Sequence, residues 1–172
     1  KLCDELEERV QKNLGVLSKG TSRVLVSGCP MAAPNWKVPF VIEKNDITIV
    51  GEESCVGERG TRNLVDESGN TVEAMMDNIA KRYLDIDCAC FTPNEERIEH
   101  IKQMAKDYKA DGVIHYTLQF CGPYTTEGHH VRKAMEQAGI PLLELETDYS
   151  MEDMDRLDVR VQAFAEVLKN KK

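Results

Sequence analysis

Four short runs of apolar residues, separated by segments with helical patterns, constrain the fold of this 172-residue chain most strongly. These runs are residues 23–28, 46–51, 112–118 and 141–146. Strands that are apolar on both faces are typical of a parallel sheet covered by helices on both sides, because a half-exposed strand would alternate apolar and polar residues. The sequence therefore predicts an α/β fold. The run at 23–28 is the least interrupted by polar residues, which predicts an internal strand.

Amphipathic patterns supply the helices of this fold. A leading helix is expected over residues 1–19, where apolar residues recur every three or four positions and Gly20 ends the pattern. Further helices are expected to begin at Pro34, at Asn70, after a Thr92 cap, at Thr126 and after a Ser150 cap. The stripe of the helix that begins at Asn70, with Met75 and Met76, is expected to pack in the core.

The domain organisation follows from this order of elements. Residues 1–22 are expected to form the leading helix, and residues 23–172 a single α/β domain with an open four-stranded parallel sheet and helices on both faces, Rossmann-like or flavodoxin-like. The chain begins at Lys1 and not at Met, so we expect it to be a fragment or a processed product.

Charge and motif content exclude several classes of function. The formal net charge of −8 disfavours non-specific nucleic-acid binding, because an acidic surface repels phosphates. No apolar run approaches the roughly 18 residues of a membrane span, and residues 1–10 are too charged for a signal peptide, so a protein that binds no membrane is expected. Proline follows Cys29 where a dinucleotide fingerprint needs glycine, and no phosphate-binding P-loop is present.

Three of the six cysteines follow predicted strands. Cys29 follows the first strand, Cys55 the second and Cys121 the third. Because parallel strands bring their carboxyl ends to one edge of a sheet, we expect these thiols to share that edge, with sulfurs roughly 6–7 Å apart if they hold a cluster. Thiolates suit iron–sulfur clusters or zinc, and zinc would need a fourth ligand such as His129 or His130. Buried thiols without a metal are the remaining alternative.

The other cysteines and one histidine carry weaker signals. Cys88 and Cys90 form a close pair before a helix. They could lie near the cluster or bind a metal weakly, but they are expected to be packing residues outside the cluster ligands. Cys3 is interpreted as an incidental or interface thiol. His115 lies within a strand and is expected to be a core histidine.

Charged and hydroxyl groups also gather in the predicted strand-end loops. They could tune a cluster, relay protons or bind an anionic substrate, or they could simply be solvated. The charged residues are Glu58, Arg59, Arg62 and Glu127, and the hydroxyl residues are Tyr124, Thr125 and Thr126.

Four stretches of the chain resemble a known family. They are SGCPMAAPNWK, GEESCVGERGTRNLVDE, RYLDIDCACFTPN and KADGVIHYTLQFCGPYTTEG. Together they resemble the C-terminal half of the 2-hydroxyacyl-CoA dehydratase D-component family, which includes benzoyl-CoA reductase subunits and double-cubane cluster proteins. Cys121, in Gln119-Phe120-Cys121, matches a cluster ligand of that family. Cys29 and Cys55, with the loop that runs to Arg62, look more like the double-cubane branch, in which a sulfide joins two four-iron cubanes.

The resemblance implies a function. The chain would be the cluster-binding part of an anaerobic iron–sulfur reductase or dehydratase. It would use low-potential electrons from an ATP-dependent iron–sulfur activator to reduce or dehydrate a small or CoA-linked substrate. The N-terminal half of the family would supply further ligands, so the cluster is expected to be incomplete, and the enzyme inactive, without it.

A cytoplasmic location and a homodimer or a paired subunit are also implied by the resemblance. The alternatives are a subunit that binds acyl-CoA or a partner without a complete cluster, and a zinc or thiol-redox module.

Overall fold

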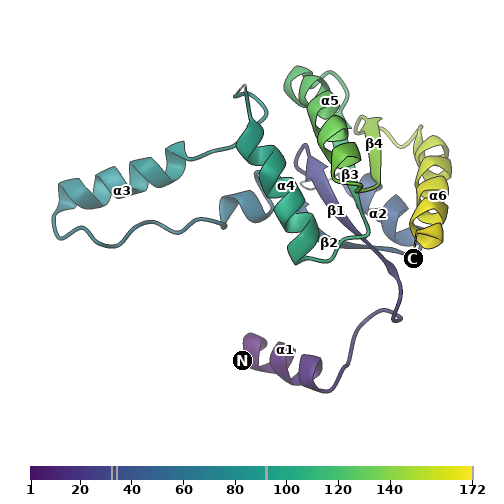
Figure 1. The fold of residues 1–172 in the computed structure, drawn as a ribbon, viewed down its shortest axis with the longest axis horizontal. Coiled ribbons are helices and arrows are strands. Elements are labelled where there is room, and N and C mark those ends of the chain that lie inside the picture. The colour runs from purple at the N-terminus through teal and green to yellow at the C-terminus, as the bar shows by residue number, and fades with distance from the viewer. Residues whose placement is uncertain (32, 34, 92, 172) are drawn as a thin grey trace.

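The structure is a computed structural model that describes residues 1–31, 33, 35–91 and 93–171 (Figure 1). Within these residues the chain forms six α-helices, one 3₁₀ turn and four strands. In chain order they are α1 (Leu2–Gln11), β1 (Ser22–Gly28), α2 (Lys37–Lys44), β2 (Ile47–Glu53), η1 (Glu58–Gly60), α3 (Val72–Leu84), α4 (Glu95–Asp107), β3 (Gly112–Leu118), α5 (Gly122–Gln137), β4 (Leu142–Thr147) and α6 (Met154–Asn170). No helix in the described part of the chain is long and apolar enough to cross a membrane.

The four strands form one parallel sheet in the order β2-β1-β3-β4. Val26 on β1 lies opposite Ile114 on β3, and Tyr116 on β3 lies opposite Leu145 on β4. The predicted parallel sheet is confirmed, and so is the internal position of the first strand. All residues of β1 except Arg23 are buried, as expected for a strand covered on both faces.

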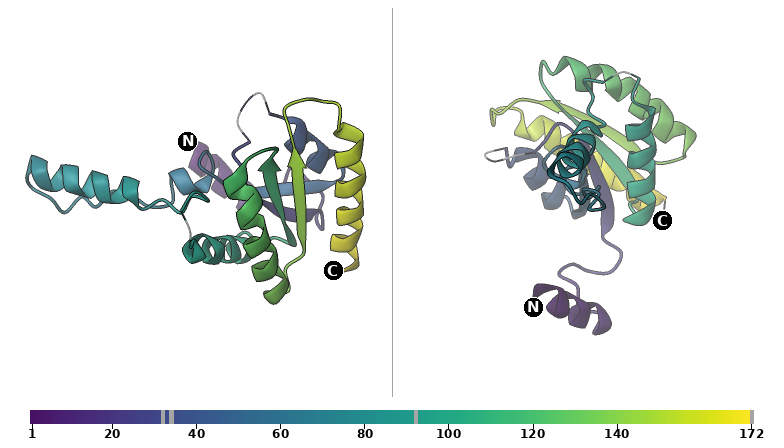
Figure 2. Two further views of the ribbon diagram at one scale, coloured as in Figure 1. Left: turned by 90° about the horizontal axis from the view of Figure 1, so that it is seen from above. Right: turned by 90° about the vertical axis from the view of Figure 1, so that its left-hand side faces the viewer.

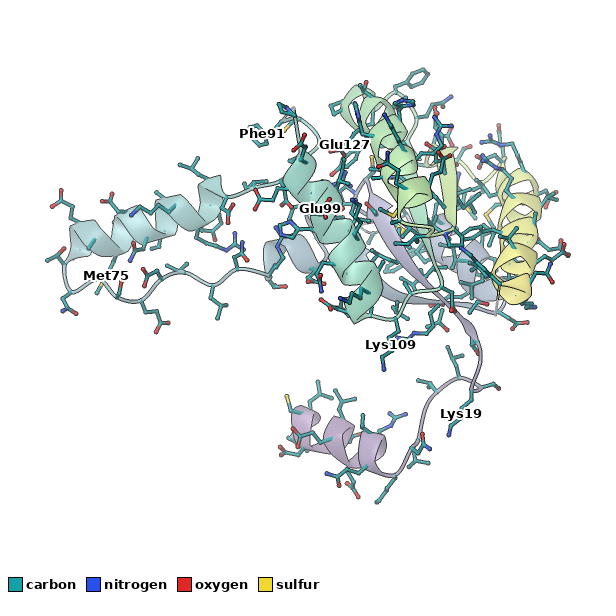
Figure 3. The ribbon with its side chains drawn as sticks, viewed as in Figure 1. Lys19, Met75, Phe91, Glu99, Lys109 and Glu127 are labelled. Atoms are coloured by element: carbon teal, nitrogen blue, oxygen red, sulfur yellow. The ribbon has the colours of Figure 1, made fainter. Side chains whose placement is uncertain are left out.

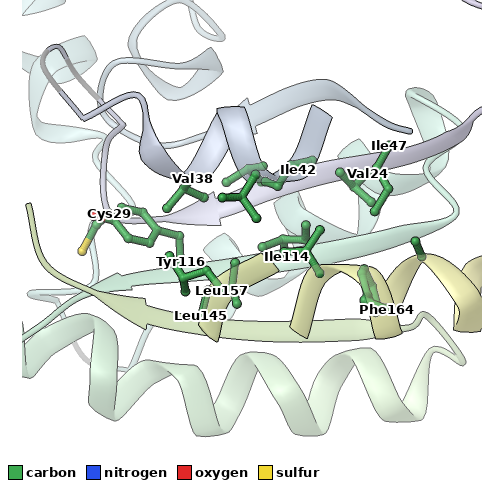
Figure 4. Close-up of a cluster of buried hydrophobic side chains, with 14 of the residues drawn as sticks. Val24, Cys29, Val38, Ile42, Ile47, Ile114, Tyr116, Leu145, Leu157 and Phe164 are labelled. Atoms are coloured by element: carbon green, nitrogen blue, oxygen red, sulfur yellow. The ribbon is translucent and has the colours of Figure 1, made fainter. Parts of the chain in front are cut away.

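Helices cover both faces of the sheet, as predicted (Figure 2). On one face α2 and α6 pack on the strands, and their buried side chains include Val38, Ile42 and Leu157 (Figure 4). On the other face α4 and α5 form a second apolar cluster through Ile101 and Met135. These two layers fix the strands, and the loops at their carboxyl ends are therefore held on a rigid base.

Helices α1 and α3 lie apart from these layers (Figure 1). Neither contains a buried residue. The prediction that Met75 and Met76 are core residues is wrong, since they are 51% and 58% exposed. The apolar stripe is present on α3, but α3 projects from the sheet and finds no layer to pack against (Figure 2). The leading helix also ends at Gln11 and not near residue 19, because the chain turns through a positive φ of 56° at Asn13.

Several helix starts differ from the predicted ones by a few residues. The expected starts at Pro34 and Thr92 lie outside the described residues, and the two helices begin at Lys37 and Glu95. Helix α5 begins at Gly122, four residues before the expected Thr126. The additional helical turn begins directly after Cys121, so the third strand-end cysteine lies at the start of a helix.

Two predicted caps are also displaced. Helix α3 is capped by Thr71 in place of Asn70, and the Thr71 hydroxyl accepts a hydrogen bond of 3.2 Å from the amide of Ala74. Helix α6 follows Asp153 and not Ser150. Asp153 is fixed by tertiary contacts, since it pairs with the ammonium group of Lys37 at 2.6 Å.

Candidate metal centre

The three strand-end cysteines lie where the sequence predicts them relative to the strands. Cys29 directly follows β1, Cys55 lies two residues beyond β2, and Cys121 follows β3 and is the N-cap residue of α5. Strand β1 lies between β2 and β3, so the three cysteines follow the carboxyl ends of adjacent strands. Cys29 is buried, Cys121 is half-buried and Cys55 is exposed.

The backbone around Cys29 holds its thiol in place. Gly28 adopts a φ of +118°, and the amide of Cys29 donates to the carbonyl of Tyr116 at 2.9 Å. The amide of Leu118 donates to Cys29 Sγ at 3.3 Å. Burial raises the pKa of the Cys29 thiol to about 12, with a further contribution from neighbouring Cys121. Without a metal this thiol is therefore neutral near pH 7.

Cys55 lies beside an arginine and interacts electrostatically with the thiol of Cys90. The guanidinium Nη1 of Arg59 is 3.5 Å from Cys55 Sγ. A hydrogen bond with the Cys88 thiol raises the pKa of Cys90, and Cys55 contributes in the same direction. Burial opposes the ionisation of Cys88, but hydrogen bonds with the backbone and thiol of Cys90, together with Arg59 and Arg97, outweigh burial and lower the Cys88 pKa. Cys90 is therefore an electrostatic neighbour of Cys55.

The donor set suits a thiolate-bound metal group only in part. Soft thiolates are the ligands of iron–sulfur clusters and of zinc. In the described part of the chain, however, no group of three or more His, Cys, Asp or Glu side chains is placed to hold a metal ion. His129 and His130, the suggested fourth zinc ligands, are exposed on α5. The sulfur separations predicted for a cluster stay a prediction.

A buried network of charges joins the strands to α4 and α5. Glu53, at the end of β2, pairs with Arg59 at 2.6 Å and with Arg97 at 2.8 Å. Arg97 also pairs with Glu127 on α5. Ser27 on β1 donates to Glu53 at 3.0 Å and accepts from Arg97 at 2.9 Å. Two carboxylates and two guanidinium groups thus balance each other inside the protein.

Burial and pairing compete at each member of this network. Burial disfavours the charge of Arg59, but Glu53 outweighs it and the Arg59 pKa is raised. At Glu127 burial raises the pKa, and Arg97 opposes it. A buried pair of this kind resists the loss of either partner, because the remaining charge would be left without compensation.

Sequence reasoning identified only part of this network. It treated Arg59 and Glu127 as loop charges that could be solvated, but both are buried. It missed Glu53 and Arg97. One signal was available for Arg97: it lies four residues before Ile101, on the apolar face of α4, where a fully buried charge needs a partner.

A second cluster of charges anchors the base of the segment that carries α3. Arg62 pairs with Asp87 at 3.0 Å, and His100 Nδ1 lies 2.6 Å from the same carboxylate. Burial raises the pKa of Asp87, but its hydrogen bonds with His100 and Arg62 outweigh burial, and the net shift is downward. The predicted loop charge Arg62 is therefore a structural contact.

His115 is a core histidine, as predicted. It is 1% exposed, and its Nε2 lies 3.3 Å from the carbonyl oxygen of Tyr124. Burial lowers the pKa of His115 to about 4, with a smaller contribution from Arg97.

A cavity of about 450 Å³ lies between the start of α4 and the start of α5, and the thiol-bearing residue Cys90 lines it. Cys90 and Pro93 form one side of it, and Pro123, Thr126 and Glu127 form the other. Figure 3 shows Glu127 next to α4, and Phe91 in the loop that leads into α4. Gly122, which also lines the cavity, directly follows the candidate metal ligand Cys121.

The fold and this site define an α/β protein in which cysteines follow three adjacent strands and a buried network of ion pairs joins the strands to α4 and α5. Residues 1–168 match the family model of the 2-hydroxyglutaryl-CoA dehydratase D-component, and the chain belongs to that family. The predicted family resemblance is confirmed.

Three relatives support this assignment. YjiM of Escherichia coli, named as a dehydratase subunit, is 38% identical over 147 residues, which are 85% of this chain and 37% of that protein. The (R)-phenyllactyl-CoA dehydratase beta subunit of Clostridium sporogenes is 33% identical over 85% of this chain and 38% of its own length. The (R)-2-hydroxyglutaryl-CoA dehydratase subunit beta of Acidaminococcus fermentans is 24% identical over 97% of this chain and 46% of that protein. The chain spans less than half the length of each relative.

Proposed function

We propose that this chain is the cluster-binding part of a dehydratase subunit that acts on CoA-linked substrates. The observation that carries the proposal is the position of Cys29, Cys55 and Cys121 after three adjacent parallel strands in a chain of the D-component family. The domain of residues 23–172 would hold an iron–sulfur cluster at this edge of the sheet.

The three thiolates would be the ligands that this chain contributes. The described residues form no closed site, so further ligands would come from outside them, either for one four-iron cubane or for a double-cubane cluster. When bound, the cluster would supply single electrons at low potential. The amide of Leu118 and the guanidinium of Arg59 donate towards Cys29 and Cys55, and both stabilise negative charge on sulfur.

Partner proteins are part of the proposal. The electrons would come from an ATP-dependent iron–sulfur activator in the cytoplasm, and the chain would act as a homodimer or as a paired subunit. Two named relatives are beta subunits, which supports pairing. The exposed apolar faces of α1 and α3, including Leu6 and Ile79, supply surface for such contacts.

A second candidate function is a subunit that binds acyl-CoA or a partner and holds no complete cluster. The absence of a closed ligand group within the described residues favours this alternative. Iron analysis separates the two candidates.

The test is iron and sulfide analysis after anaerobic purification of the full-length protein. We expect the wild-type protein to contain both elements, and Cys121→Ser to lose them. Cys3→Ser is the matched control, because Cys3 is exposed on α1, and it should retain the wild-type iron content. Full iron retention by Cys121→Ser, or its loss in Cys88→Ser and Cys90→Ser instead, would overturn the ligand assignment.

A further inference from the structure

The cavity between α4 and α5 has the character of a small-molecule site. Its volume of about 450 Å³ lies within the range of known ligand pockets, which is roughly 300–1,000 Å³. Its walls are predominantly apolar and include Ala89, Pro93, Ile98 and Pro123. Apolar walls favour an apolar ligand, because binding removes the apolar surfaces of both the cavity and the ligand from water.

The polar groups of the cavity carry negative charge or none. Glu95 and Glu127 both line it, together with the amide of Asn94. Neither lysine nor arginine is among the described residues that line the cavity. An anionic group of a ligand would therefore lose its hydration on binding and lie close to the negatively charged side chains of the cavity.

The polar end of the cavity is held rigidly. Glu127 is only 7% exposed, pairs with Arg97, and accepts a hydrogen bond of 3.0 Å from Asn94. Because Arg97 is fully buried and also bound to Glu53, Glu127 cannot turn away without leaving a buried guanidinium partly unpaired. The charge pattern that a ligand meets is thus a fixed property of the fold.

From these contacts we infer that the cavity binds the acyl group of an acyl-CoA thioester and selects uncharged apolar acyl groups over those that end in a carboxylate. This inference rests on the proposed function for the thioester, and it adds the class of acyl group. Cys90 borders the cavity and Cys121 directly precedes its α5 wall, so a bound acyl group would lie beside Cys90 and one residue from Cys121 in the chain.

Equilibrium binding to the full-length protein tests the selectivity. Titration calorimetry would compare 3-phenylpropanoyl-CoA, glutaryl-CoA and free CoA, each with the same nucleotide part. We expect 3-phenylpropanoyl-CoA to bind at least about tenfold more tightly than glutaryl-CoA, since it buries a phenyl ring and no charge. Equal affinities for all three ligands would overturn the inference, because the CoA part alone would then account for binding.

Two matched pairs of variants locate the effect in this cavity. Thr126→Trp fills the cavity from an exposed position on α5 and should weaken 3-phenylpropanoyl-CoA at least about fivefold, whereas His129→Trp, exposed on the same helix but outside the cavity, should not. Glu95→Lys should strengthen glutaryl-CoA at least about threefold, and its exposed neighbour Glu96→Lys should not.

Equal effects within each pair would refute the assignment of the cavity. If the cavity instead receives a segment of a partner protein, Thr126→Trp leaves the affinity for 3-phenylpropanoyl-CoA unchanged, and the inference fails. Iron content is measured separately. A protein without iron that still shows the selectivity and the variant effects would therefore refute the cluster proposal and leave the acyl site standing.

Discussion

Gly28 occupies a position that no other residue can fill. A Cβ atom there would lie 2.0 Å from the carbonyl oxygen of Tyr116, and its φ of +118° is strained for any residue with a side chain. We predict that Gly28→Ala lowers the free energy of unfolding by at least about 2 kcal/mol, because the backbone of β1 or β3 must move. Urea denaturation measures this loss.

Gly139 provides the matched control for this substitution. It also has a positive φ, of +68°, but no atom lies within 4 Å of the position that its Cβ would take. Gly139→Ala should therefore cost only about 1 kcal/mol. Equal losses in the two variants would show that the close approach to Tyr116 contributes nothing.

Arg97 compensates two buried carboxylates at once. We predict that Arg97→Met lowers the free energy of unfolding by about 3–5 kcal/mol, because Glu127 would then be buried without a cationic partner. The exposed pair of Arg132 with Glu144, at 3.4 Å, supplies a control, and Arg132→Met should change stability by no more than about 0.5 kcal/mol. A loss below about 1 kcal/mol for Arg97→Met, measured by the same denaturation, would contradict the role of the network.

At the residue level the sequence predicts the strand-end cysteines well and the buried charges poorly. Cys29, Cys55 and Cys121 each follow an apolar run, so their position depends only on where strands end. Glu53 and Arg97 are 44 residues apart in sequence and meet only because α4 packs across the sheet. No local pattern specifies such a pair.

Helix α3, like α1, has an apolar stripe without a covering layer. We predict that Met76→Lys changes the free energy of unfolding by less than about 0.5 kcal/mol, since Met76 is 58% exposed. Met104→Lys, on α4, should instead cost at least about 3 kcal/mol, because Met104 is 4% exposed. Thermal and urea unfolding of both variants compare the two sites.

A large loss for Met76→Lys would contradict the exposed position of the α3 stripe in the isolated chain. Helical periodicity predicted the apolar stripes of α3 and α4 equally well. The pattern shows that a helix is amphipathic, but it does not show whether another element packs against the apolar side. The strands were predicted within about two residues, whereas the start of α6 was not, because Lys37, 116 residues away in the chain, takes part in fixing Asp153.

Acid should destabilise the whole domain through His115. Its pKa is about 4 in the folded protein and 6.5 when unfolded, so the unfolded chain binds more protons between these values. Stability is therefore lost as the pH falls from about 6.5 to about 4, and it is unaffected by this group at higher pH.

The expected difference is measurable with a variant. Between pH 7 and pH 4.5 the wild type should lose about 2 kcal/mol more than His115→Leu, which cannot titrate there. Urea unfolding at the two pH values measures both losses, and the comparison cancels the carboxylates that the proteins share. Equal losses of the free energy of unfolding in the two proteins would show that His115 does not resist protonation in the folded state.

The side chain of Arg23, at the start of β1, donates to the carbonyl of Tyr108 at 2.8 Å, and its amide donates to Asp111, 88 residues away in the chain. The segment that carries α3 lies inside this span. Folding must therefore join two local units, β1-α2-β2 and β3-α5-β4, by closing one long loop. Closure entropy grows only logarithmically with loop length, by about 0.6 kcal/mol per doubling. Lengthening or shortening the α3 segment should thus change the folding rate only slightly, which leaves that segment free to vary in length while the sheet edge keeps its geometry.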